Sequence, residues 1–334
     1  MNTLRPREPA FMLWRTNPTV MIGANQIAEI EADLAYARES SIAVVRRSSG
    51  GGAIYTDPDT VLYTIILPYT ESDAFDIKAA CSDYLSGPVI AALGELGVAA
   101  SLEGRNDILV DGKKIAGIAQ YIKHGYLCSH GSLLFDADLG ELTRVLTVND
   151  EKIKSKALRS VRSRVTNIKE HLPQAAEAEN GLRASTRKDD SGFLQSGEPD
   201  TAAFMNALRG HLSRAFAPAE YTFSESDLAG IEKLRAEKYA SDEWTFGRTP
   251  RYSFHSAGRF AGGSVEIFAD VKNGVIERLK ITGDFLALRP VSDVEYRFVD
   301  IPFRTDTIAS VLAGINTSDY FGAITREELL SVFR

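Results

Sequence analysis

The alternation of apolar and polar positions predicts strands in the segment Ser41–Ile66. Apolar runs at residues 42–45, 53–55 and 61–67 are separated first by a glycine-rich stretch and then by Pro58-Asp59. Glycine, proline and aspartate between β-branched or aromatic runs are typical of turns that join strands. We therefore expect strand, glycine loop, strand, turn and strand, in that order.

A second set of apolar runs predicts consecutive hairpins. Ile108–Val110 is followed by Asp111-Gly112 and the apolar stretch 114–121, and His124-Gly125 then leads into residues 126–135. Asp-Gly between apolar runs is a strong hairpin signal, because both central residues of such a turn need positive φ. Strands joined by short turns favour antiparallel pairing over a parallel, doubly wound sheet.

Helical spacing of apolar residues indicates several helices. It extends over Asp76–Leu96, where Gly87-Pro88 predicts a kink or a division into two short helices, and over Ala202–Phe216 and Ser226–Tyr239.

The composition changes after Pro173. Residues 173–199 are rich in Ala, Glu, Ser and Gly, which predicts an exposed, flexible insertion. Near the C-terminus, strands at 263–271 and 275–282 flank Asn273-Gly274, and an amphipathic helix is expected at Asp306–Leu312. The last part of the chain therefore resembles a small separate α+β unit.

Length and charge exclude several classes of protein. The chain has 334 residues, 44% of them apolar, and no apolar run approaches the roughly 20 residues that cross a bilayer. Two cysteines and the lack of a signal-peptide core lead us to expect a cytoplasmic protein. The net charge of −7 disfavours nucleic acid as a partner. The basic stretch Lys152–Arg164 is either a solvated face or a surface for phosphate or an acidic partner.

The glycine loop (Arg46–Gly52, RRSSGGG) carries the most specific chemistry. Three glycines allow positive φ and close approach of a ligand, and successive amides can form an anion-binding nest. Arginine and serine add donors suited to phosphate. A bulge that binds nothing is the alternative. The motif is neither a P-loop nor a dinucleotide-binding turn, because no Gly-Lys-Ser/Thr follows and the next element is a strand.

Six sequence blocks, taken in order, resemble the lipoate–protein ligases. They are Arg46–Tyr55 (RRSSGGGAIY), Gly104–Ile108 (GRNDI), Lys113–Gln120 (KKIAGIAQ), His130–Leu134 (HGSLL), Ser160–Asn167 (SVRSRVTN), and a C-terminal set running from Lys238-Tyr239 through Trp244–Gly247 and Gly263–Glu266 to Gly283–Phe285. Each block alone is a weak signal, but their shared order over residues 14–285 is a strong one.

This resemblance implies an α/β (α+β) fold in two parts. A large domain like that of biotin and lipoate ligases, with a mixed, largely antiparallel sheet, would occupy residues 1–245, with the insertion at about 173–200, and a small C-terminal domain would occupy residues 246–334. The implied reaction uses ATP to convert lipoate into lipoyl-AMP and then transfers the lipoyl group to a lysine. ATP, Mg²⁺ and lipoate are the implied substrates and cofactors. The implied acceptors are lipoyl domains of 2-oxoacid dehydrogenase E2 subunits and the glycine-cleavage H protein, with no nucleic acid or membrane partner.

The resemblance also implies the residues of the site. Those expected against ATP and lipoyl-AMP are Arg47, Ser49, Gly50, Gly51, Gly52, Ala53, Ile54, Tyr55, Asn106, Asp107 and Lys114. Lys114, Ser49 and His130 are expected to contact lipoate, and Asp107 is the candidate Mg²⁺ ligand. Lys114 is the candidate catalytic residue, because an ammonium between carboxylate and α-phosphate would offset their charges. Strand alternation predicts that Lys114, Ala116 and Ile118 share one face. The block Arg159–Asn167 is expected to close over the adenylate.

The chain departs from the family's usual pattern at three points. Only ten residues precede the Phe11–Trp14 run, where the family usually has a strand and a helix, so we expect a late start or a member that lacks this element. Thr56 stands where histidine is common, and Ala24 where a basic residue is usual.

Other functions are compatible with the same fold. An ATP-independent octanoyl or lipoyl transferase would use an acyl-cysteine, and Cys128 lies two residues before His130. A buried, inert cysteine is the alternative role for Cys128. A non-catalytic lipoate-binding protein is a further alternative.

Overall fold

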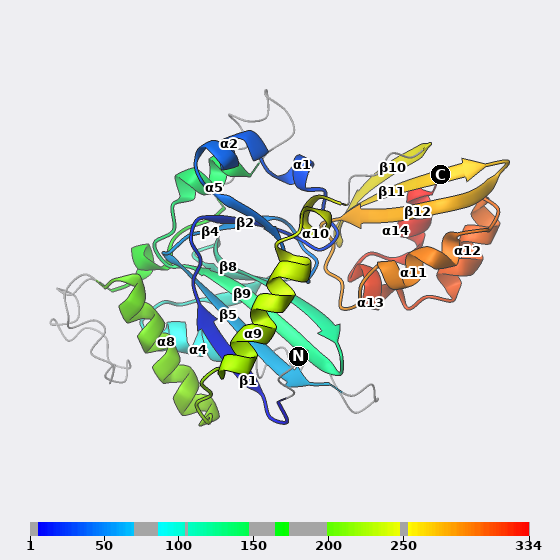
Figure 1. The fold of residues 1–334 in the computed structure, drawn as a ribbon. Coiled ribbons are helices and arrows are strands. Elements are labelled where there is room, and N and C mark those ends of the chain that lie inside the picture. Colours follow the sequence, from blue (N-terminus) through cyan, green and yellow to red (C-terminus); the bar gives the residue numbers. More distant parts are fainter. Residues whose placement is uncertain are drawn as a thin grey trace.

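The computed structural model describes residues 6–69, 86–103, 106–146, 164–173, 199–247 and 253–333. Its largest sheet has the strand order β1-β5-β9-β8-β7-β6, and every neighbouring pair is antiparallel (Figure 1). The strands are β1 (Ala10–Trp14), β5 (Thr60–Pro68), β6 (Ser101–Glu103), β7 (Asp107–Val110), β8 (Lys113–Lys123) and β9 (Tyr126–Leu134). The antiparallel hairpins predicted for residues 108–135 are confirmed.

The turns of this sheet have the backbone conformation that their sequence requires. Asp111 and Gly112 have φ of 49° and 72°, and His124 and Gly125 have φ of 52° and 78°. Both pairs are therefore two-residue turns with positive φ, whose twist matches that of the strands they join.

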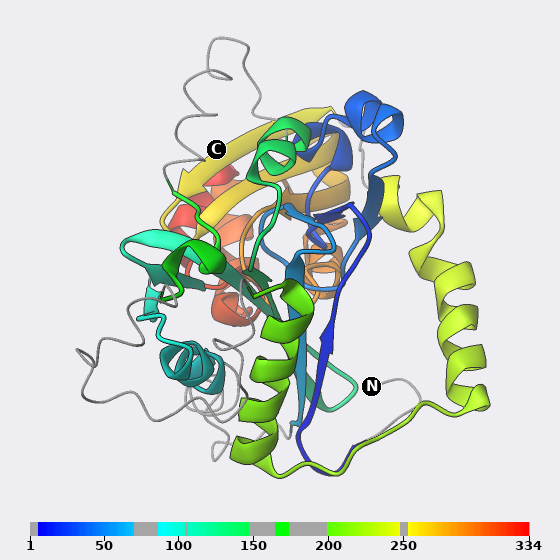
Figure 2. The ribbon, with the colours of Figure 1, turned by 90° about the vertical axis from the view of Figure 1, so that its left-hand side faces the viewer.

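One face of the six-stranded sheet is covered by two helices, α4 (Gly87–Glu95) and α8 (Thr201–Phe216) (Figures 1 and 2). On β5, the alternate residues Val61, Tyr63 and Ile65 pack into the core beneath these helices. Because side chains alternate along a strand, the residues between them face the opposite side of the sheet. That opposite side forms the floor of the candidate site.

A small mixed sheet covers that second side. It has the order β3-β2-β4, with β2 (Thr19–Ile22) parallel to β3 (Ala43–Arg46) and antiparallel to β4 (Ile54–Thr56). The strands on either side of the glycine loop are thus confirmed. They do not pair with each other, because β2 lies between them. The loop therefore bridges two strands that are not neighbours.

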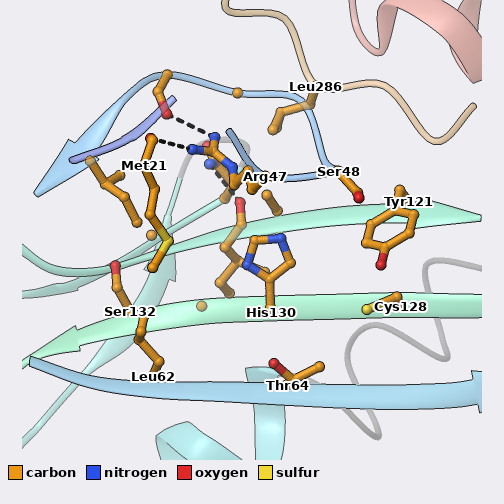
Figure 3. A pocket seen from close by; sticks show the side chains of 18 of the residues that line it. Met21, Arg47, Ser48, Leu62, Thr64, Tyr121, Cys128, His130, Ser132 and Leu286 are labelled. Atoms are coloured by element: carbon orange, nitrogen blue, oxygen red, sulfur yellow. Dashed lines mark hydrogen bonds between the residues drawn. The ribbon is translucent and has the colours of Figure 1, made fainter. Parts of the chain in front are cut away.

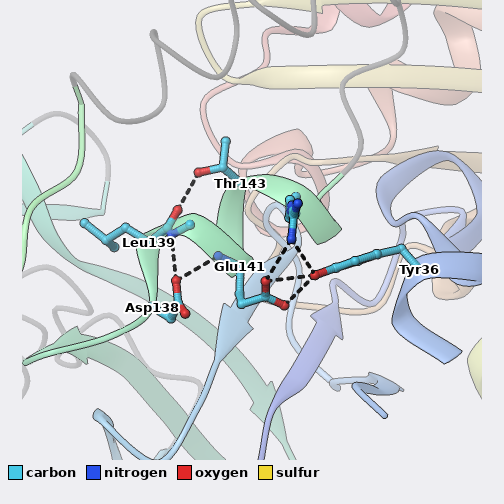
Figure 4. A network of polar contacts seen from close by, with 7 residues as sticks. Tyr36, Asp138, Leu139, Glu141 and Thr143 are labelled. Carbon is cyan, nitrogen blue, oxygen red and sulfur yellow. Dashed lines mark hydrogen bonds and ion pairs between the residues drawn. The ribbon is translucent and has the colours of Figure 1, made fainter. Parts of the chain in front are cut away.

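Three short helices support the small sheet, and a polar network fixes them. They are α1 (Ala28–Glu31), α2 (Leu34–Glu39) and α5 (Leu139–Val145). The Tyr36 hydroxyl donates to the Glu141 carboxylate at 2.8 Å, and the Asp138 side chain accepts from the first amides of α5 (Figure 4). These contacts hold α5 against α2 beside the small sheet.

The predicted C-terminal hairpin is confirmed, and it belongs to a three-stranded sheet. Its strands are β10 (Phe254–Phe260), β11 (Gly263–Lys272) and β12 (Val275–Gly283), in the order β10-β11-β12. Helices α11 (Ser292–Glu295), α12 (Thr305–Ala313), α13 (Thr317–Phe321) and α14 (Arg326–Val332), with the short η4 (Tyr296–Phe298), complete this unit. Its apolar cluster contains only residues from Phe254 onward.

Three further helices connect the large sheet with the C-terminal unit. They are α9 (Glu225–Leu234), η3 (Arg235–Tyr239) and α10 (Asp242–Phe246); the 3₁₀ turn η2 (Ile168–His171) precedes them in the chain. The predicted helices at 202–216, 226–239 and 306–312 are thus confirmed to within a few residues. Of the predicted helix at 76–96, residues 76–85 lie outside the described part, as does most of the insertion at 173–199. Within the described residues, no helix is long and apolar enough to cross a membrane.

Candidate active site

A cavity of about 280 Å³ lies between the free face of the large sheet and the glycine loop (Figure 3). Of the residues predicted for the site, eight line it: Arg47, Gly51, Gly52, Ala53, Ile54, Asn106, Lys114 and His130. Ser49 and Asp107 contact lining residues through a hydrogen bond to His130 and an ion pair with Lys114. Gly50 and Tyr55 are not part of the wall. The structure therefore brings most of the predicted residues to one cavity.

Lys114 faces the cavity because of a bulge in β8. The β7–β8 register shifts between Ile108 and Leu109, so that Ile115 and Ala116 both pack into the core. This interrupts the alternation and places Lys114 on the same face of the strand as Gly117. A Cβ built at Gly117 would lie 3.0 Å from the Lys114 Nζ. The prediction that Lys114 and Ala116 share a face is therefore wrong.

The backbone and side chain of Lys114 are both held. Its amide donates to the Arg164 carbonyl at 2.7 Å, and its carbonyl accepts from the Thr166 amide at 3.0 Å. Its Nζ lies 2.8 Å from an Asp107 carboxylate oxygen. Of the block expected to close over the adenylate, residues 159–163 lie outside the described part, whereas Arg164 and Thr166 anchor the strand beside Lys114.

Each of the three glycines of the loop stands at its position for a different physical reason. Gly51 has φ of +87°, which disfavours other residues. Gly50 lies against the C-terminal unit, since an ideal Cβ there would be 2.7 Å from the Phe285 carbonyl oxygen. A Cβ at Gly52 would meet nothing within 4 Å, which leaves open space for a ligand. The Gly51 amide donates to the Phe285 carbonyl at 3.1 Å, so this member of the predicted nest is engaged.

Arg47 lies in the loop with its guanidinium bonded to the protein. Nη1 donates to the Met21 carbonyl at 2.9 Å, and Nη2 donates to the Gly50 and Gly52 carbonyls at 2.7 and 2.8 Å. Burial is the main cause, and the charge of neighbouring Arg46 a smaller one, that lowers the pKa of Arg47 to about 10. The group is still a cation at neutral pH, held by neutral acceptors that a phosphate oxygen can replace.

His130 is a neutral imidazole in the middle of the cavity wall. Its Nε2 lies 2.6 Å from the Ser49 Oγ. Burial, and then the positive charge of Arg47, lowers the pKa of His130 to about 4. The ring therefore acts as a hydrogen-bonding group rather than a second cation at neutral pH.

Cys128 also lines the cavity, but its thiol is not activated. It is 4% exposed, and burial raises its pKa to about 11, even though a hydrogen bond from Tyr121 acts in the opposite direction. Because the thiolate is the nucleophilic form, a thiol of this kind is a poor acyl acceptor at neutral pH. The site thus disfavours the acyl-cysteine transferase.

Asp107 fits a Mg²⁺ site only in part. Among the described residues, no three His, Cys, Asp or Glu side chains form a metal-binding group. Mg²⁺ commonly uses one or two carboxylates and takes its other ligands from phosphate and water. The Asp107 carboxylate is therefore suitable as a single protein ligand alongside a bound nucleotide.

Sequence reasoning missed two kinds of residue at this site. The first are cavity residues on the floor and rim: Trp14, Leu62, Thr64, Tyr121 and Leu286. Alternation on β5 and β8 was a usable signal for Leu62, Thr64 and Tyr121, whereas Leu286 comes from the distant C-terminal unit and had none. The second is Arg46, which is 2% exposed and donates to the carbonyls of Gly23, Gln26 and Thr245.

Comparison with known proteins agrees with this geometry. Residues 1–184 match the family model of the lipoyl protein ligase A/B catalytic domain, and residues 249–333 match that of the bacterial lipoate protein ligase C-terminus. The lipoate-protein ligase LplJ of Bacillus subtilis is 35% identical over 333 residues, which cover 98% of this chain and 92% of that protein.

Two solved structures have the same fold. A bipartite lipoate protein ligase from Thermoplasma acidophilum, studied with its E2 lipoyl domain, is 27% identical with a TM-score of 0.58, and the match covers 74% of this chain and 87% of that one. A lipoate-protein ligase A bound with ATP is 26% identical with a TM-score of 0.53, and the match covers 72% and 86%.

Proposed function

The chain belongs to the lipoate–protein ligase family, and we propose that the cavity beneath its glycine loop carries out both half-reactions of that family. In the first, a lipoate carboxylate oxygen attacks the α-phosphorus of ATP and pyrophosphate leaves. In the second, the amine of an acceptor lysine attacks the acyl carbon of lipoyl-AMP and AMP leaves. The acceptor nitrogen loses a proton and keeps the lipoyl group as an amide.

The first half-reaction brings two anions together, so charge compensation and positioning are its main requirements. Lys114 and Arg47 supply two cations on the wall of one cavity. The Lys114 ammonium would bridge the carboxylate and the α-phosphate. Arg47 would exchange its contacts with the Gly50 and Gly52 carbonyls for phosphate oxygens, and the open space at Gly52 would receive the nucleotide.

The second half-reaction develops negative charge on the acyl oxygen, which Lys114 would stabilise from the same position. The neutral His130, bonded to Ser49, would hold the acyl group without adding a charge. Asp107 orients the ammonium at 2.8 Å and would also hold Mg²⁺ when the nucleotide is bound. The metal would supply further neutralisation of phosphate charge.

The observation that carries this proposal is the convergence of Lys114, Arg47 and the glycine loop on one cavity. Its test is mass spectrometry of a lipoyl domain after incubation with the protein, ATP, Mg²⁺ and lipoate. We expect a gain of one lipoyl group, reduced at least about 100-fold in rate by Lys114→Ala, since the variant loses the cation at the reacting centre. A Lys113→Ala control, at the neighbouring exposed lysine, should retain the rate. Equal rates in all three proteins would refute the role of Lys114.

The remaining assignments follow from the same family. We propose that the acceptors are lipoyl domains of 2-oxoacid dehydrogenases and the glycine-cleavage H protein, and that the protein acts in the cytoplasm. We also propose that residues 1–245 form the catalytic domain and residues 246–334 an accessory domain. The separate apolar cluster from Phe254 onward supports that division.

A further inference from the structure

At Lys114, strand β8 extends beyond the end of its neighbour β9. The pairing of β8 with β7 includes Lys113, whereas its pairing with β9 begins only at Ala116. Residues 164–166 take the place of β9 at this point, in a parallel bridge between Lys114 and Val165. The bridge uses both the amide and the carbonyl of Lys114, at 2.7 and 3.0 Å. The direction in which Lys114 leaves the strand therefore depends on where this segment lies.

The next residue, Asn167, fastens this segment to the chain that continues from β9. Its Oδ1 accepts from the Ala137 amide at 3.1 Å, and its Nδ2 donates to the Ala137 carbonyl at 3.0 Å. Both residues are buried. A side-chain amide carries an acceptor and a donor side by side, so it can pair with both backbone groups of one residue. The Asn167 side chain thus joins the two segments where the ladder between β8 and β9 has ended.

Two further contacts hold the chain after Asn167. Ile168 is buried in the core of the large sheet, and the Lys169 amide donates to the Phe135 carbonyl at 3.0 Å. These contacts would keep the segment attached to the protein without the Asn167 side chain. Neither adjoins the bridge, whereas Asn167 directly follows Thr166, whose amide bonds to the Lys114 carbonyl. Loss of the Asn167 side chain should therefore loosen the bridge more than it loosens the rest of the segment.

We propose that Asn167 is a positioning residue for the Lys114 amine. By pairing with Ala137, it fixes the bridging segment against β8, and the backbone of Lys114 is bonded to that segment at two points. Because a side chain starts from its backbone, a shift of the bridge displaces the Lys114 Nζ from its place 2.8 Å from the Asp107 carboxylate. This inference rests on the proposed function, since it takes Lys114 as the cation of both half-reactions.

The test is Asn167→Ala, assayed by lipoate-dependent ATP–pyrophosphate exchange and by transfer from preformed lipoyl-AMP to a lipoyl domain. We expect kcat per folded protein to fall about 3- to 10-fold in both assays, the effect of displacing a positioned group by a fraction of an ångström. The KM for ATP should stay unchanged, because the glycine loop is not altered. In Lys114→Ala/Asn167→Ala, the second change should cause no further loss, because both act through one amine. If Asn167→Ala does not fold, Asn167→Asp provides the same comparison, since it keeps the acceptor and loses the donor.

Lys169→Ala is the matched control. It removes an ion pair with Asp136, 2.8 Å long, which joins the same two stretches of chain at the protein surface, and it should leave kcat unchanged. A normal kcat in the folded Asn167 variant would overturn the inference. So would an equal fall of kcat when Asn167→Ala is added to Lys114→Ala, because Asn167 would then act independently of the amine. Transfer by Lys114→Ala at the rate of the unchanged protein would instead contradict the proposed function.

Discussion

Gly117→Ala is the substitution that most directly tests the proposed position of the Lys114 amine. An ideal Cβ at this position would lie 3.0 Å from the Lys114 Nζ and 3.1 Å from its Cε. Both contacts are tighter than ordinary van der Waals contact, so the end of the lysine must move by a few tenths of an ångström. No backbone atom is as close, and Gly117 is not among the glycines with positive φ.

The expected effect is therefore a moderate loss of rate with little change in the stability of the fold. A displacement of about 1 Å in a group that positions reacting atoms costs on the order of 100-fold in rate. The free energy of unfolding should stay the same or rise by about 0.4–1 kcal/mol, because alanine restricts the unfolded chain. The shift expected here is a few tenths of an ångström, so we predict that kcat falls about 3- to 10-fold in both half-reactions.

Pyrophosphate exchange measures the first half-reaction, and transfer from preformed lipoyl-AMP to a lipoyl domain measures the second. Gly94→Ala in α4 is the matched control, because an added Cβ there meets nothing within 4 Å and should leave kcat unchanged. Lys114→Ala/Gly117→Ala should be no slower than Lys114→Ala alone. A normal kcat in Gly117→Ala, or a further large loss in the double variant, would refute the argument that the glycine acts through the amine.

Two other predictions concern titratable side chains near the loop. Burial, and then the charge of Asp284, raises the pKa of Glu31 from 4.5 to about 7. The folded protein therefore keeps a proton that the unfolded chain releases, so the free energy of unfolding falls as pH rises from about 4.5 to 7 and stays lowered above it. Glu31→Gln should remove this fall. Urea denaturation should show a free energy of unfolding raised by up to about 3 kcal/mol at pH 8 and little changed at pH 4. The same dependence of unfolding free energy on pH in the variant and the unchanged protein would contradict this prediction. Cys128→Ala should keep ATP-dependent lipoyl transfer within about 3-fold, as shown by acceptor mass, since the protonated thiol is not a nucleophile; total loss would favour the transferase.

Turn chemistry explains why so much of the fold could be predicted from the sequence. Asp111-Gly112 and Asn273-Gly274 are local signals, and all four residues have positive φ as their hairpins require. The pairing of β3 and β4 with β2 was not predictable in this way. The strand that separates them comes from residues 19–22, earlier in the chain, and no local pattern states which strand will lie between two others.

The candidate site shows the same limit at the level of single residues. Composition predicted that the glycine loop binds an anion, but it could not distinguish Arg46 from Arg47, because their side chains are chemically identical. Both bond backbone carbonyls, but Arg46 reaches that of Thr245 and does not line the cavity, whereas Arg47 bonds the carbonyls of Gly50 and Gly52 and lines it. The Trp244 and Thr245 carbonyls that accept from Arg46 lie about 200 residues away in the chain, so the loop sequence alone could not show which arginine is buried in the fold and which lines the cavity.

The bulge in β8 supplies the physical reason for a glycine beside Lys114, the proposed catalytic residue. In an uninterrupted strand that keeps Gly117 on the cavity face, alternation would place Ile115 in the cavity and turn Lys114 into the core. An ammonium buried among apolar side chains without a partner costs several kcal/mol. The extra residue instead sends Ile115 into the core and brings Lys114 onto the same face as Gly117. The lysine then lies over its neighbour within contact distance, and any side chain there would displace it. The bulge and the glycine therefore act together. The bulge places the Lys114 amine on the cavity face of the strand, and the glycine leaves the space that the amine occupies.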